Sequence, residues 1–294
     1  MDTANIKFSD FTDCSSINTE FEFNGISGRA DLDSGYGHEI VIDSTFFFQK
    51  LFETAKFIYS PPPFKMYYWT AYYSGNLTIR YGKYSLNVTK FKVYNLKDGY
   101  GCTNIDAIVG DSIFENKITL IDYDNNKIAF VDTVIVDSSY IALPMYNRDH
   151  KGCNHKNIRI DGFRTNDNRT KSGLFLIDFG TTHGGIIMKR DFAHNLLLDI
   201  KHADILRSIH SYGEQDYRWR IDSLQMGTFL LNNVPARRVK NDKGYDRIDM
   251  IDGADGLIGL ALLKRFNMIL DYKHNILYLK PNKYFEEKNQ VQKK

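Results

Sequence analysis

The sequence predicts a mostly β protein with two similar lobes, and three observations support this fold class. Phenylalanine and tyrosine, which strands favour, occur 20 and 19 times among the 294 residues. The apolar segments are mostly short and separated by turn residues, as in strands rather than long helices. One residue pattern occurs twice in diverged form, so we interpret the chain as a tandem duplication. The length allows each lobe to bury a core of its own.

The first half of the repeated pattern is an aspartate at the end of an apolar run. Residues 33–35 read Asp-Ser-Gly and residues 178–180 read Asp-Phe-Gly, and a histidine follows each aspartate by five positions, at His38 and His183. Because glycine lets the backbone turn tightly, each aspartate should be held rigidly where a strand ends. We interpret the two histidines as strand-start packing or pocket-lining residues, with a metal or acid–base role as the alternative.

The second half of the pattern is a turn of two apolar residues and a glycine, which ends residues 106–110 and 255–259. Each turn glycine precedes an aspartate by 12 residues, Asp122 in the first copy and Asp271 in the second, and a hairpin follows. Residues 122–126 are acidic enough to suggest a calcium loop. They lack the central glycine and terminal glutamate of such a loop, so we predict a hairpin turn.

Together, the paired turns resemble those of the pepsin-like, two-lobed aspartic proteases over roughly residues 20–282. The resemblance implies a double β-barrel with the active site between the lobes. It places an N-terminal lobe at residues 1–140 and a C-terminal lobe at residues 141–294. It also implies that Asp33 and Asp178 are the catalytic pair. The loop residues that would support them are Ser34, Gly35, Gly180, Thr181 and Thr182.

The predicted chemistry follows from two carboxyl groups held close together. At about 3 Å they cannot both ionise easily, so they share one proton. One can then act as a base toward water while the other acts as an acid toward a carbonyl, and the pair titrates as a unit. This chemistry hydrolyses an amide with no covalent intermediate, no metal and no cofactor. We therefore predict an aspartic-type endopeptidase that acts on a peptide or protein substrate.

Two positions depart from the family pattern and leave other functions open. Phe179 stands where the family has serine or threonine, so only Ser34 can supply a hydroxyl that braces the two loops. Tyr36 replaces a small hydroxyl residue beside the first carboxylate, whereas Thr181 keeps that role in the second lobe, so Asp178 should be the more acidic partner. The alternatives are a non-catalytic peptide- or glycan-binding protein of the same fold, and an inhibitor or interaction module whose own side chains fill the cleft.

A tyrosine-glycine pair, Tyr81 and Gly82, is the candidate for substrate binding. It lies in residues 77–86, which alternate apolar and polar around the glycine and therefore predict a hairpin. In the resembled family a first-lobe hairpin with a tyrosine covers the substrate, and Tyr81 follows Asp33 by a fitting distance of 48 residues. Such a flap would exclude water and position the scissile bond. A tyrosine-rich surface hairpin is the alternative.

The remaining elements follow from apolar periodicity and turn residues. We predict further strands at residues 5–10, 19–32, 88–94, 117–123 and 127–136. A short helix is predicted at residues 45–56, after the first aspartate loop, and a longer one at residues 190–209, where apolar side chains recur at helical spacing. The linker between the lobes is expected near residues 137–157, where Pro144 and Gly152 interrupt the pattern.

Composition and charge restrict the partners and the compartment. A net charge of +2 suggests neither a nucleic-acid nor a membrane partner, and the longest apolar runs are far short of a membrane span. The cysteines Cys14, Cys102 and Cys153 are odd in number and lack metal-ligand or redox spacing, which argues against a disulfide scaffold. No signal peptide or pro-segment is visible, so we expect a cytoplasmic monomer if Met1 is the native start, and otherwise an exported one with its signal removed.

Overall fold

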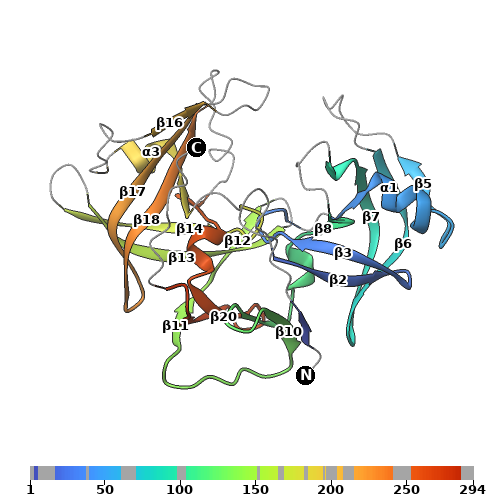
Figure 1. The fold of residues 1–294 in the computed structure, drawn as a ribbon, viewed down its shortest axis with the longest axis horizontal. Helices are drawn as coiled ribbons and strands as arrows, with labels where there is room; N and C mark the ends of the chain where they lie inside the picture. Colours follow the sequence, from blue (N-terminus) through green and yellow to red (C-terminus); the bar gives the residue numbers. More distant parts are fainter. Residues whose placement is uncertain are drawn as a thin grey trace.

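The fold was analysed in a computed structural model of the chain. The residues that it describes are 3–5, 17–37, 40–60, 71–97, 104–150, 153–164, 169–181, 185–194, 196, 204–207, 215–240 and 253–285. Within them β-strands dominate and helices are short, which confirms the predicted mostly β class. Figure 1 shows two lobes side by side and a third sheet below them.

The first lobe is a closed ring of six strands. In ring order these are β2 (Ile17–Phe23), β3 (Ile26–Leu32), β8 (Ala107–Val109), β4 (Ile40–Asp43), β7 (Tyr84–Tyr94) and β6 (Ala71–Tyr81). The ring closes because β6 also pairs with β2, and the short strand β5 (Ile58–Ser60) adds to the outer edge of β6. Most ladders are antiparallel, but β3 runs parallel to β8 and β4 runs parallel to β7.

The second lobe repeats this ring strand for strand. In ring order its strands are β13 (Cys153–Arg164), β14 (Thr170–Ile177), β19 (Gly256–Ile258), β15 (Ile186–Met188), β18 (Phe229–Lys240) and β17 (Gln215–Met226). A pairing of β13 with β17 closes it, and β14 and β19 run parallel like β3 and β8. The strands β12 (Tyr146–His150) and β16 (Asp204–Arg207) extend the sheet. The shared ring order confirms the duplication seen in the sequence.

A third sheet of six strands joins the two halves at the lower side of Figure 1. Its order is β1 (Thr3–Asn5), β10 (Lys127–Val131), β9 (Ile118–Asp122), β20 (Phe266–Asp271), β21 (Ile276–Pro281) and β11 (Ile141–Pro144). The central pair, β9 and β20, comes from equivalent hairpins of the two copies and is antiparallel. This pairing fixes the lobes relative to each other.

The helices are short and follow the loops of the repeated pattern. They are α1 (Ser44–Phe46), the π-helix η1 (Phe47–Leu51), the 3-10 helix η2 (Asp111–Ile113), α3 (Arg190–His194) and α4 (Leu260–Leu263). Both η2 and α4 begin directly after an apolar-apolar-Gly turn, at equivalent places of the two lobes. In the described part of the chain, no helix has the length and apolar character needed to cross a bilayer.

Aromatic side chains fill both barrels. In the first, the fully buried Phe47 lies with its ring centroid 4.7 Å from that of Tyr73 and 5.7 Å from that of Phe91. In the second, Phe175 and Phe192 pack edge to face at 5.4 Å. Such pairs add to the free energy gained by burying the rings, so each lobe has its own core.

Several boundaries differ from those that the sequence predicts. The helix predicted at residues 45–56 is helical only to Leu51. Of the helix predicted at residues 190–209, Arg190–His194 are helical, whereas the prediction is wrong at residues 204–207, which form strand β16 and pair with β17 at the sheet edge. Pairing to a neighbouring strand outweighs the helical spacing of the apolar residues there.

The predicted linker near residues 137–157 holds β11, β12 and the start of β13, so most of it is sheet. The strand predicted at residues 127–136 ends at Val131. The turns after Asp122 and Asp271 are hairpin turns as predicted, closed by asparagines in the left-handed region, Asn126 with φ 53° and Asn275 with φ 58°.

Candidate active site

The first aspartate of each repeated pattern lies where a barrel strand ends. Asp33 follows β3, and its backbone N–H donates to the carbonyl of Val109 on β8 at 3.0 Å. Asp178 follows β14, and its N–H donates to the carbonyl of Ile258 on β19 at the same 3.0 Å. Because the parallel ladders β3–β8 and β14–β19 have the same geometry, the two carboxyl groups leave their barrels at equivalent points.

The aspartates that open the apolar-apolar-Gly segments anchor these ladders. The Asp106 carboxylate accepts the N–H of Arg29 at 2.8 Å, and the Asp255 carboxylate accepts that of Leu174 at 2.9 Å. In each case the aspartate's own N–H returns a bond of 2.7 Å to the same residue. The repeated spacing of these aspartates is therefore structural, and it supports each loop from behind as the family resemblance implied.

The two loops meet so that each glycine lies against the opposite carboxyl group. A Cβ atom at Gly35 would lie 2.5 Å from Cγ of Asp178, and one at Gly180 would lie 2.1 Å from Oδ2 of Asp33. Any other residue at these two positions would therefore collide with an aspartate. The loops therefore bring the two carboxyl groups close enough for each to influence the pKa of the other.

The hydrogen bonds to the two carboxyl groups are unequal. Asp33 Oδ1 accepts the Gly35 N–H at 2.9 Å. Asp178 Oδ1 accepts the matching Gly180 N–H at 2.9 Å and also the Thr181 N–H at 3.1 Å. The Thr181 hydroxyl adds a bond of 2.7 Å to Asp178 Oδ2. The second loop thus stabilises an ionised carboxylate better than the first does.

The pKa values follow this difference. Burial and then the charges of Asp178 and Asp31 raise the pKa of Asp33 well above its usual value, and its hydrogen bond to Asp178 adds to the rise. Burial also raises the pKa of Asp178, but the Thr181 hydroxyl and the Asp33 carboxyl oppose that rise. The surroundings of Asp178 therefore favour its ionised form more than those of Asp33 do. This agrees with the sequence-based expectation that Asp178 is the more acidic partner.

Tyr36 packs beside the first loop. Its ring packs on a small buried cluster that includes Val41 and Ile108, and Lys92 Nζ lies 5.6 Å from the ring centroid. The hydrogen bond that lowers the pKa of Asp33 comes from Gly35. The first carboxyl group therefore depends on a backbone N–H.

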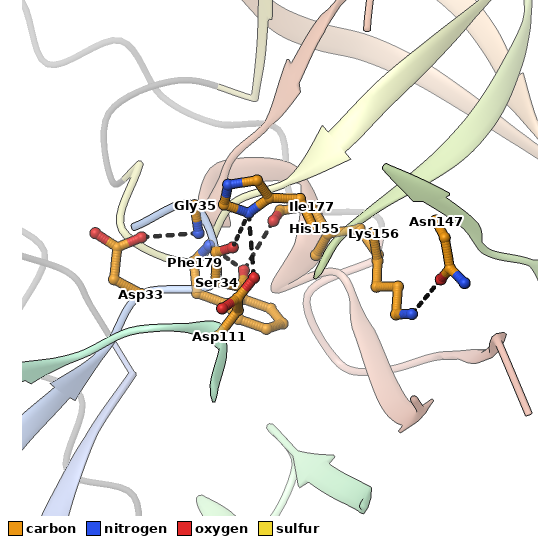
Figure 2. A network of polar contacts seen from close by, with 9 residues as sticks. All are labelled: Asp33, Ser34, Gly35, Asp111, Asn147, His155, Lys156, Ile177 and Phe179. Carbon is orange, nitrogen blue, oxygen red and sulfur yellow. Dashed lines mark hydrogen bonds and ion pairs between the residues drawn. The ribbon is translucent and has the colours of Figure 1, made fainter. Parts of the chain in front are cut away.

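Among the described residues of the two loops, Ser34 supplies the hydroxyl brace between them, as the sequence predicts. Its Oγ donates to the carbonyl of Ile177 at 2.8 Å and accepts the N–H of Phe179 at 3.1 Å (Figure 2). The Phe179 side chain is fully buried, with its ring centroid 6.1 Å from that of Phe114. It therefore packs into the interior, below the loops that carry the two aspartates.

Two buried polar residues that the sequence analysis did not single out also contact the first loop. His155 Nδ1 on β13 lies 3.3 Å from the carbonyl oxygen of Ser34 and 3.3 Å from Oδ2 of Asp111 (Figure 2). One signal was present in the sequence: Asp111 follows the first apolar-apolar-Gly turn, where the second copy has Leu260.

Tyr81 does not occupy the position predicted for a flap. It ends strand β6 as a buried side chain, and its hydroxyl donates to the carbonyl of Ile128 on β10 at 2.9 Å. Its ring lies 5.1 Å from that of Phe21 and 5.3 Å from that of Phe130. Gly82 forms the turn with a φ of 57°. This end of the β6–β7 hairpin therefore faces the sheet between the lobes, and Tyr81 is a core residue there.

The opposite end of β6 is the one that approaches the aspartate loop. Tyr72, near the start of β6, and Tyr36, three residues after Asp33, both have their ring centroids 5.6 Å from Lys92 Nζ. Strand β5 pairs with this end of β6 through Tyr59 and Ser60. The residues that connect β5 to β6 lie outside the described part.

Three predicted residues lie outside the described residues: Thr182, His38 and His183. Among the residues that the structure describes, no group of three or more histidine, cysteine or acidic side chains could hold a metal ion.

Comparison with known proteins supports the fold. No family model and no curated protein matches the sequence. The structure is similar to the crystal structure of an aspartic proteinase from Irpex lacteus, with a TM-score of 0.56 over 97% of this chain and 98% of that chain. The sequences are 13% identical over this match. The chain therefore has the two-lobed, pepsin-like fold of that proteinase, and a likeness at this identity establishes the fold alone.

The position of Tyr81 leads to a stability prediction. Tyr81→Phe should lower the free energy of unfolding by about 1–2 kcal/mol, because the buried carbonyl of Ile128 loses its donor. Tyr59→Phe is the matched control, since Tyr59 is 56% exposed, and should change the free energy of unfolding by less than about 0.5 kcal/mol. Chemical denaturation followed by circular dichroism measures both. Equal stability of Tyr81→Phe and the parent would contradict a core role for the hydroxyl.

Proposed function

We propose that the chain is an aspartic endopeptidase of the pepsin–retropepsin type, in which Asp33 and Asp178 share one proton and activate a water molecule. The observation that carries the proposal is the close approach of the two carboxyl groups, each packed against the opposite loop's glycine. The pepsin-like fold is a second support. The substrate is a peptide or a protein, and the reaction needs no metal or other cofactor.

The unequal surroundings of the two carboxyl groups assign the roles of acid and base. Ionised Asp178 takes a proton from water, whose oxygen forms a bond to the amide carbon, while protonated Asp33 gives its proton to the carbonyl oxygen. The product of this step is a gem-diol, with Asp33 now ionised and Asp178 protonated. When the C–N bond breaks, Asp178 protonates the leaving nitrogen and a gem-diol hydroxyl returns its proton to Asp33. The dyad thus ends in its starting state.

The two departures from the family pattern are compatible with this reaction. Phe179 was the main argument for a non-catalytic binding protein, yet its side chain is fully buried and packs against Phe114. Tyr36 lies against its own hydrophobic cluster and Lys92. Neither residue displaces an aspartate, so we favour the enzyme over the binding protein.

The first test removes one carboxyl group at a time. Asp33→Asn and Asp178→Asn should each lower peptide hydrolysis by at least about 100-fold, because an amide cannot exchange the proton that the reaction needs. Asp132→Asn, at a surface aspartate with a 69% exposed side chain, is the matched control and should leave the rate unchanged. Initial rates on a peptide library, with circular dichroism to verify folding, measure the effect. An aspartate whose variant keeps the parent rate is not part of the dyad.

The second test is the pH dependence of kcat/KM. The raised pKa of Asp33 keeps the dyad singly protonated toward neutrality, so we expect a mildly acidic to neutral optimum, with the basic limb set by loss of the Asp33 proton. Thr181→Val removes a donor to ionised Asp178, which raises the pKa of that carboxyl and moves the acidic limb to higher pH. An optimum below about pH 4, or an acidic limb that does not move, would contradict this assignment.

A further inference from the structure

A buried histidine–aspartate pair links the two lobes directly behind the first aspartate loop. Asp111 comes from helix η2 of the first lobe and is 0% exposed, and His155 comes from strand β13 of the second lobe and is 8% exposed. Figure 2 shows the imidazole ring next to the 33–35 loop, with Asp111 on the same side of the ring as Ser34. The next residue, Lys156, points the other way along β13, toward Asn147.

The geometry identifies which ring nitrogen carries hydrogen. Nδ1 of His155 lies 3.3 Å from two oxygens, the carbonyl of Ser34 and Oδ2 of Asp111. A backbone carbonyl can only accept a hydrogen bond, and so can an ionised carboxylate. Nδ1 must therefore be the donor, with its hydrogen directed at the Ser34 carbonyl and the Asp111 carboxylate within ion-pair distance of the same nitrogen. Asp111 then fixes both the tautomer and the orientation of the ring.

The contact reaches Asp33 through one peptide unit. The carbonyl of Ser34 and the N–H of Gly35 belong to the same planar peptide group, so they point in opposite directions and turn together. The Gly35 N–H donates to Asp33 Oδ1 at 2.9 Å. Holding the Ser34 carbonyl toward His155 therefore holds the Gly35 N–H toward the carboxyl group of Asp33.

The second loop has a different arrangement. Asp111 and Leu260 are equivalent residues, and their backbone N–H groups donate to the two loops in the same way, to Gly37 at 2.7 Å and to Thr181 at 2.9 Å. Only the first of them has a side chain that can hold a histidine. The Thr181 hydroxyl contacts Asp178 directly instead. The histidine–aspartate pair therefore contacts the first loop, in which the Gly35 N–H donates to the carboxyl group of Asp33.

Two further ionisable groups influence Asp111. Lys156 Nζ donates to Oδ1 of Asn275 at 2.7 Å; burial lowers the pKa of Lys156, and the charges of Asp111 and Glu115 oppose that change. Burial raises the pKa of Tyr272, and the charge of Asp111 adds to the rise. Asp111 therefore faces one buried cation and one neutral phenol in addition to His155.

We propose that Asp111 and His155 are positioning residues for the catalytic loop of the first lobe. His155 donates to the Ser34 carbonyl, Asp111 holds the ring in place, and the Gly35 N–H stays directed at Asp33. The pair spans the lobes and supplements the brace at Ser34, since Phe179 cannot provide a second hydroxyl. The catalytic consequence rests on the proposed function, whereas the effect on the loop backbone does not.

The test compares two variants that remove the histidine–aspartate pair with one that keeps a hydrogen-bond donor for the Ser34 carbonyl. His155→Leu and Asp111→Leu remove the pair, whereas His155→Asn keeps an N–H close to the position of Nδ1. Each leucine variant should lower kcat by about tenfold or more with KM changed less than about twofold, and the double variant should be no slower than either single one. His155→Asn should retain most of the parent kcat. His274→Leu is the matched control, because it removes a second His–Asp pair of 2.7 Å that lies away from the loops, and its kcat should equal that of the parent.

Two further readouts separate positioning from general stability. Without the directed Gly35 N–H the pKa of Asp33 rises, so the basic limb of the pH profile should move to higher pH in His155→Leu and stay in place in His155→Asn. Hydrogen exchange of the Gly35 amide should be faster in His155→Leu and unchanged in His274→Leu. This second readout needs no activity.

The outcomes of the two proposals can be told apart. A parent protein that hydrolyses no peptide overturns the proposed function, and the Gly35 exchange then still decides the role of the pair. An active parent whose His155→Leu and Asp111→Leu variants keep the parent kcat, basic limb and Gly35 exchange overturns the positioning role. If the leucine variants do not fold, a His155→Asn variant that folds yet exchanges Gly35 as fast as a peptide without structure also overturns it.

Discussion

The site depends on the contact between the carboxyl groups of Asp33 and Asp178, which is unfavourable when both groups are ionised. Two ionised carboxylates at such a distance repel each other, so the contact exists only with one proton between them and a rigid frame around them. The glycines make the approach possible, because a Cβ at Gly35 or Gly180 would fall within 2.5 Å of an opposite carboxyl atom. Their role is close approach and not an unusual backbone angle.

The frame is built from backbone bonds that the duplication makes in matching pairs. Each aspartate is fixed by a parallel ladder, and each ladder is anchored by a second aspartate, Asp106 or Asp255. The ladders place the carboxyl groups within their lobes, whereas β9–β20 pairing and the Ser34 hydroxyl fix one lobe against the other. A change that separates the lobes therefore changes the dyad, even when it leaves both barrels intact.

The sequence predicted what depends on local spacing and missed what depends on contacts across the fold. The two aspartates, their turns and the one-sided brace at Ser34 could be predicted because each lies within a short segment that occurs twice. Tyr81 was misplaced because its distance from Asp33 along the chain does not say which end of a hairpin faces the site; the pairing of β6 decides that. His155 was missed because its partners Ser34 and Asp111 belong to the other lobe, and only the mismatch between Asp111 and Leu260 pointed to it.

Divergence of the two copies explains why the site is more than a symmetric pair of aspartates. In a symmetric dyad neither carboxyl group is favoured as the proton carrier, and the first proton transfer can go either way. Here three donors surround ionised Asp178, including the Thr181 hydroxyl, and one backbone N–H reaches Asp33. The acid and the base of the proposed mechanism are therefore assigned before a substrate arrives. On the proposed mechanism this fixes the substrate's orientation, since the carbonyl oxygen must face Asp33 and the attacking water must lie beside Asp178.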